Sequence, residues 1–108
     1  MPREDRRIIF DKSEVYQALY RLSLKKEDMK NLSAGAIVKI SVNAEDPDQF
    51  DFHLVNPQDE TKQTVTYSKD FVAAALMMFC RGAGIPLPRR AEKSVLIREG
   101  QMILRAVV

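Results

Sequence analysis

The sequence predicts a two-layer α+β fold in which two β-α-β-β units share a mostly antiparallel sheet, with two helices on one face. Three observations lead to this prediction. The run Phe71 to Cys80 is ten consecutive apolar residues, too short to span a bilayer but suited to an enclosed core helix. Residues 36–43 and 50–55 alternate apolar and polar side chains, as half-buried strands do. The two halves of the chain show similar patterns at an offset of 57 residues.

Length and composition fit one globular domain. The 108 residues are 45% apolar and 30% charged, which is typical of a soluble, folded chain. We expect residues 1–6 to form a flexible charged tail and residues 7–108 a single domain. The only cysteine, Cys80, excludes an internal disulfide, and no secretory leader is visible, so we expect a cytoplasmic location.

The first half begins with a short strand, residues 7–10, that leads into a helix over about 12–26. Asp11 occupies the N-cap position, with Glu14 three residues later as in a capping box. The apolar positions of the helix recur at i, i+3, i+4 and i+7: Val15, Ala18, Leu19 and Leu22.

Three strands are expected in the middle of the chain. Residues 36–43 and 50–55 form a hairpin with one solvated face, joined by the polar turn 44–49. A second turn at 56–60 leads to a third strand, about 62–67.

The apolar run then forms the second helix. Ser68 is its N-cap, and Gly82 and Gly84 end it. The segment 85–88, with two prolines, cannot continue a helix and should run extended.

A final hairpin is expected over residues 93–107, divided by Glu99-Gly100. A two-residue loop there places Ile97 opposite Met102 and Val95 opposite Leu104, so one face is wholly apolar. The other face is mixed and carries Ser94, Leu96, Arg98, Gln101, Ile103 and Arg105.

The halves resemble each other around residues 9–12 and 66–69, which precede similarly spaced apolar positions. An internal duplication accounts for this likeness, and so does common capping chemistry at two unrelated strand-to-helix turns. The element order is similar to the duplicated strand-helix-strand-strand modules of several small-ligand-binding and protein-assembly domains. The resemblance concerns element order alone and implies no residue roles.

Enzyme signatures are absent from the sequence. It contains no phosphate-binding glycine loop, zinc-protease motif or nucleophile elbow. His53, the only histidine, pairs at best with Asp51 on an exposed strand face, and no nucleophile lies near it in the sequence. Cys80 fits a buried apolar position better than a reactive one. We therefore expect no enzyme activity, no metal and no cofactor.

Charge is unevenly distributed along the chain. Residues 41–60 contain six acidic residues and no Lys or Arg, whereas residues 81–105 contain six basic residues against two acidic ones. The first four bases of the second segment form a candidate basic patch: Arg81, Arg89, Arg90 and Lys93. Such asymmetry indicates either a basic binding face or solvated loops.

The mixed face of the final hairpin is the candidate partner surface, defined by Leu96, Arg98, Ile103 and Arg105. Arginine beside aliphatic side chains is typical of protein interfaces. The sequence therefore favours an interaction module that binds a protein partner or a second copy of itself, and no membrane. Two alternatives remain: nucleic-acid binding through the basic segment 81–105, and small-ligand binding in a cleft lined by Tyr16, Tyr20 and Tyr67.

Overall fold

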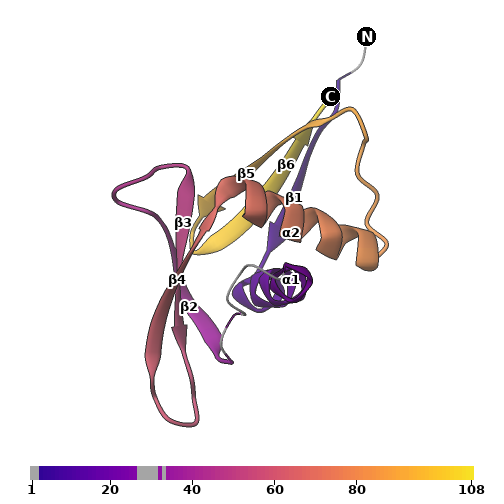
Figure 1. The fold of residues 1–108 in the computed structure, drawn as a ribbon. Coiled ribbons are helices and arrows are strands. Elements are labelled where there is room, and N and C mark those ends of the chain that lie inside the picture. Colours follow the sequence, from indigo (N-terminus) through magenta and orange to yellow (C-terminus); the bar gives the residue numbers. More distant parts are fainter. Residues whose placement is uncertain (1–2, 27–31, 33) are drawn as a thin grey trace.

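The structure, a computed structural model, describes residues 3–26, 32 and 34–108. Its elements follow the predicted order (Figure 1): β1 (Asp5–Phe10), α1 (Lys12–Lys25), β2 (Ala36–Val42), β3 (Gln49–Val55), β4 (Lys62–Ser68), α2 (Lys69–Gly82), β5 (Glu92–Arg98) and β6 (Gln101–Val107). The α+β class and the two successive β-α-β-β units are thus confirmed. β1 begins at Asp5, so Asp5 and Arg6, expected in the flexible tail, belong to a strand.

The strands form two three-stranded sheets, whereas the sequence predicted one shared sheet. One sheet has the order β1-β6-β5 and the other the order β2-β3-β4, and all pairs are antiparallel. Each unit therefore gives its first strand to the hairpin of the other unit. β1 lies against β6 of the second unit, and β4 lies against β3 of the first.

The two sheets meet at β2 and β5, which are in contact but share no ladder in the described part of the chain. The pairing of β2 with β3 is irregular between Ile37 and Lys39. A bulge at such a point bends a strand and increases its twist.

The units occupy equivalent positions in the two sheets. Phe10, at the end of β1, pairs with Met102, and Tyr67, which lies 57 residues later in β4, pairs with Phe50. Both helices have the predicted N-caps. The side chain of Asp11 accepts a hydrogen bond from the backbone N–H of Glu14, whose carboxylate accepts one from the backbone N–H of Asp11. Ser68 Oγ accepts from the N–H of Phe71 in the same way.

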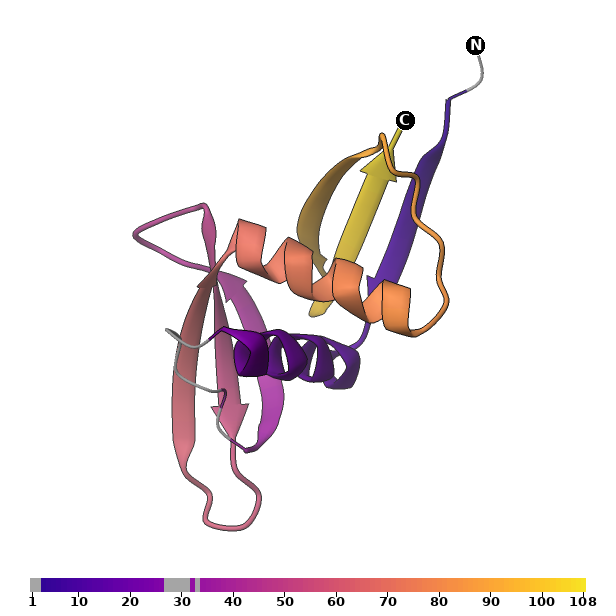
Figure 2. The same cartoon turned by 45° about the vertical axis from the view of Figure 1, so that its right-hand side comes forward.

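The helices lie side by side between the sheets (Figure 2), and each helix contacts both sheets. The sheets extend from the helix pair in opposite directions, which gives the molecule extents of 54 × 28 × 24 Å. One core joins the elements. Its largest fully buried side chains include Phe10, Phe50, Phe52, Leu19, Leu76, Met102 and Leu104.

The apolar run forms α2, as predicted, but is enclosed on one side only. Val72, Ala75, Leu76 and Cys80 are buried, whereas Ala74 is exposed. The flanking side chains, among them Met77 and Phe79, are half-buried against the core. Two small sheets cover less of a helix than one continuous sheet would. Among the described residues no helix is both long and apolar enough to cross a membrane.

Candidate functional site

The predicted register of the final hairpin is confirmed. Ile97 pairs with Met102, Val95 with Leu104 and Leu96 with Ile103. Because side chains alternate across a strand, the β1-β6-β5 sheet has an inner face toward the helices and an outer face away from them. We call the second of these the outer face. It carries the whole candidate partner surface.

An apolar row crosses the middle of the outer face. Ile9 of β1, Ile103 of β6 and Leu96 of β5 are directly opposite one another. Ile9 is 59% exposed and Leu96 is 45% exposed, but Ile103 is only 7% exposed. From the sequence, only the two strands of the final hairpin were expected on this face. In the structure β1 makes β6 the central strand, so Ile103 is covered from both sides and Ile9 joins the surface.

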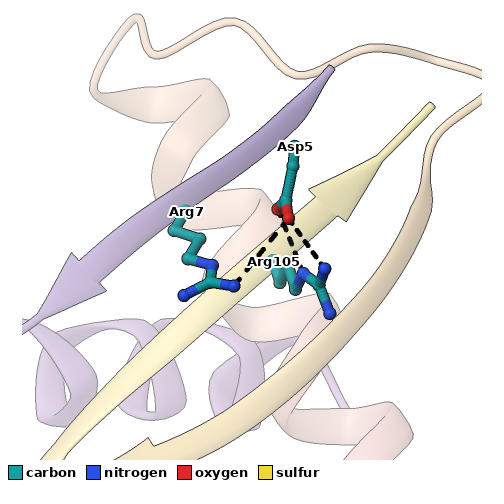
Figure 3. A network of polar contacts seen from close by, with 3 residues as sticks. All are labelled: Asp5, Arg7 and Arg105. Carbon is teal, nitrogen blue, oxygen red and sulfur yellow. Dashed lines mark hydrogen bonds and ion pairs between the residues drawn. The ribbon is translucent and has the colours of Figure 1, made fainter. Parts of the chain in front are cut away.

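An ion-pair network lies next to this row (Figure 3). Arg105 donates to both carboxylate oxygens of Asp5, from Nε at 3.0 Å and from Nη2 at 2.7 Å. Arg7 Nη2 lies 3.8 Å from Asp5 Oδ2. These donors hold the pKa of the Asp5 carboxyl below its ordinary value, the hydrogen bonds from Arg105 most of all. The charge of Arg105 is therefore largely neutralised within the chain.

A shallow hollow of about 260 Å³ opens beside the apolar row. Ile9 and Ile103 supply its apolar lining, and its rim is polar: Arg7, Arg98, Glu99 and Gln101. Arg98 forms no ion pair with any residue that the structure describes. The exposed side chain of Leu96 projects next to the hollow, so the outer face carries both a projection and a recess.

Three members of the candidate basic patch lie away from the outer face. Lys93 is two residues before the inward-facing Val95 and therefore lies on the same inner face, and Arg81 is in the last turn of α2. Arg81, Arg89 and Lys93 line one pocket of about 730 Å³, whereas Arg90 does not. Arg98 and Arg105 are on the outer face. The bases of segment 81–105 are thus divided between two surfaces.

The outer face of the β2-β3-β4 sheet is polar. Asp51 Oδ1 accepts hydrogen bonds from Asn43 Nδ2 at 2.9 Å and Thr66 Oγ1 at 2.7 Å, which lower the pKa of its carboxyl. The ring of His53 lies 3.1 Å from Thr64 Oγ1 and 3.5 Å from Ser41 Oγ. The hydroxyl of Ser41 is a neighbour that the sequence did not indicate, because it comes from the adjacent strand.

This cluster lacks the features of a hydrolytic site. Asp51 accepts its side-chain hydrogen bonds from Asn43 and Thr66 and not from His53, so this carboxylate does not orient the imidazole. Neither His53 nor Ser41 lines the hollow beside Ile103 or the pocket lined by Arg81, Arg89 and Lys93. The arrangement stabilises a solvated sheet face through cross-strand hydrogen bonds.

The other candidate residues are separated in the structure. Tyr16 and Tyr20 stack on each other with ring centroids 6.1 Å apart, whereas Tyr67 is buried and stacks on Phe71 at 4.6 Å. None of the three tyrosines lines the hollow beside Ile103 or the pocket lined by Arg81, Arg89 and Lys93. Cys80 is fully buried, and desolvation raises the pKa of its thiol, which disfavours the nucleophilic thiolate. The described residues contain no group of three or more His, Cys, Asp or Glu side chains suited to a metal ion.

Comparisons of the chain with protein-family models, with curated proteins and with solved structures give no match in any of the three.

Proposed function

We propose that this protein is a small non-enzymatic interaction module that self-associates through the outer face of the β1-β6-β5 sheet. One observation carries the proposal: the apolar row in which Ile9 and Leu96 remain solvent-exposed on either side of Ile103. An aliphatic row across three strands that is exposed at its two outer members, with arginine around it, matches the composition of protein interfaces.

The outer face suits a second copy of the chain because it is complementary to itself. A two-fold interface places the same patch on both sides, so each patch must offer both a projection and a recess. Leu96 is the projection, and the hollow beside Ile103 is the recess. Both charge signs also occur at the rim, where Arg98 is followed by Glu99. Arg98 of one copy can thus approach Glu99 of the other.

The size of the face sets the expected affinity. Three strands of seven residues or fewer cover roughly 15 by 23 Å, from the usual strand spacing and rise. That footprint, about 350 Å² per copy, is smaller than the roughly 500 Å² per partner of stable specific interfaces, so the association should be weak and transient. We therefore expect a dimer with a dissociation constant in the micromolar range or above. We also propose a cytoplasmic location, which the lone buried cysteine supports.

Nucleic-acid binding through segment 81–105 has less support. Its bases lie on two opposite sides of one sheet, and Arg105 is already paired with Asp5. Binding along a nucleic-acid backbone requires bases that follow one continuous surface.

Sedimentation velocity over a concentration series tests the proposed self-association. The wild-type chain should shift from monomer to dimer as its concentration rises, and Leu96→Glu and Ile9→Glu should remain monomeric. Val42→Glu is the matched control, because Val42 is 50% exposed on a strand of the other sheet. Ile103→Glu is less informative, since a charge at a buried position destabilises the fold itself.

Circular dichroism of each variant verifies that it is folded. A wild-type chain that stays monomeric throughout, or a Leu96→Glu variant that dimerises as well as Val42→Glu, contradicts the proposal.

A further inference from the structure

A pocket of about 730 Å³ lies at the end of α2, on the other side of the sheet from the proposed dimer face. Its wall is the connection from α2 to β5, which passes beside β1 (Figure 2). We propose that this pocket binds a small amphipathic anion, consisting of an aliphatic chain that ends in a carboxylate or a phosphate.

The charge of the lining favours an anion. Arg81, Arg89 and Lys93 contribute three cationic groups, and no Asp or Glu is among the lining residues. None of the three forms an ion pair with a residue that the structure describes. Lys93 Nζ donates a hydrogen bond to the backbone carbonyl oxygen of Ala91 at 3.3 Å. Because this acceptor is neutral, the positive charge of Lys93 remains uncompensated. An anionic head group would supply the missing charge.

The end of a helix normally repels an anion, because its last carbonyl groups are unpaired. Here those carbonyls are occupied. The N–H of Ala83 donates to Phe79 O at 2.9 Å, that of Gly84 to Arg81 O at 3.3 Å and that of Ile85 to Cys80 O at 2.8 Å. The carbonyl groups of the last turn therefore compete less with a bound anion for the neighbouring cations.

The remainder of the lining is aliphatic. Met77, Ile85 and Leu87 face the same space as the three bases, together with Pro86 and Pro88. No aromatic side chain is present to stack on a nucleobase, so the lining suits a hydrocarbon chain better than a nucleotide. The volume of about 730 Å³ is within the usual range of small-molecule sites.

The wall of the pocket is preorganised. Arg6 Nη1 donates to the carbonyl oxygen of Pro86 at 2.7 Å, which attaches the connection to β1. The fixed backbone angles of Pro86 and Pro88 further limit its conformations. A rigid wall reduces the entropy lost when a ligand binds.

Isothermal titration calorimetry with decanoate and decyl phosphate tests the proposal. Both probes should bind, whereas decanol and decyltrimethylammonium should bind at least tenfold more weakly, because they lack the negative charge. Inorganic phosphate, which lacks the chain, should also bind at least tenfold more weakly than decyl phosphate. Binding of both charged probes should weaken as salt is added, since Arg81 and Arg89 are exposed.

A pair of adjacent arginines gives the matched variants. Arg89→Gln should weaken decanoate binding about tenfold, because a charge-assisted hydrogen bond is lost, and its combination with Lys93→Gln should weaken binding further. Arg90→Gln removes the same single charge as Arg89→Gln, one residue away and outside the pocket, and should change the affinity less than threefold. Thermal unfolding of each variant shows whether the fold is intact.

The proposal is overturned if neither charged probe binds, if decanol or inorganic phosphate binds as tightly as they do, or if Arg90→Gln weakens binding as much as Arg89→Gln. It is also overturned if an oligonucleotide displaces decanoate from the pocket at equal or lower concentration. Leu96→Glu should bind decanoate normally, so failure of this proposal and failure of the dimer proposal can be distinguished.

Discussion

Replacement of Gly35 by alanine should destabilise the fold more than the same change at Gly84. Gly35 precedes β2 and lies against the end of β3, with a φ of +154°. A methyl group there would be 2.9 Å from the carbonyl oxygen of Val55 and 3.3 Å from its carbonyl carbon. Both contacts are with backbone, so no side chain can rotate away and the β2-β3 pairing itself must shift.

The expected cost has two parts. Unfavourable backbone conformations cost about 1–3 kcal/mol, and forcing a methyl group into a packed position adds about 1–3 kcal/mol. The sum for Gly35→Ala is therefore about 2–6 kcal/mol of unfolding free energy. Gly84 has a φ of +74°, but nothing lies within 4 Å of an added methyl group. Gly84→Ala should cost only the left-handed conformation, about 1–2 kcal/mol.

Urea denaturation followed by far-UV circular dichroism measures both variants against the wild type. Equal m-values would show that the free energies can be compared. The reasoning is refuted if Gly35→Ala is no less stable than Gly84→Ala, because the close approach to Val55 would then have no energetic consequence.

Two further predictions concern the core and the polar sheet face. Leu76→Ala should lower the unfolding free energy by about 2–5 kcal/mol, because the side chain is fully buried and its removal leaves a cavity. Urea denaturation measures this loss, and a value below about 1 kcal/mol would contradict the packing described for α2. Asp51 should titrate below the ordinary value of 3.8, so its hydrogen bonds stabilise the fold above about pH 3.8 and this contribution is lost as the pH falls through the lowered pKa. Thr66→Val should raise that pKa toward 3.8 in a carboxyl NMR titration, and an unchanged value would exclude the Thr66 hydrogen bond as a cause.

Local patterns in the sequence predict the elements and the final hairpin well. A two-residue period and a Glu-Gly loop determine that Ile97 faces Met102, since a one-residue slip would turn the apolar side chains to solvent. Asp11 and Ser68 mark helix starts because capping involves residues only a few positions apart. Such signals are contained within short segments and can be read without knowledge of the rest of the fold.

The pairing of distant strands has no such local signal. Nothing in the pattern of residues 7–10 indicates that this strand lies beside β6, so Ile9 was not placed on the outer face and Ile103 was expected to be exposed. Asp5, expected in a tail, is the carboxylate that pairs with Arg105. The bases Arg81, Arg89 and Lys93 were grouped by sequence, but the aliphatic lining that makes their pocket amphipathic arises only from tertiary contacts.

The exchange of first strands between the units has a consequence for biosynthesis. Asp5 pairs with Val107, so the edge strand β1 of the β1-β6-β5 sheet pairs with a segment about a hundred positions later in the chain. During translation β1 has no partner until β6 has left the ribosome, whereas β2, β3 and β4 can already form their meander. The nascent chain therefore presents an unpaired strand for most of its synthesis, a state that invites chaperone binding or pairing with a neighbouring nascent copy.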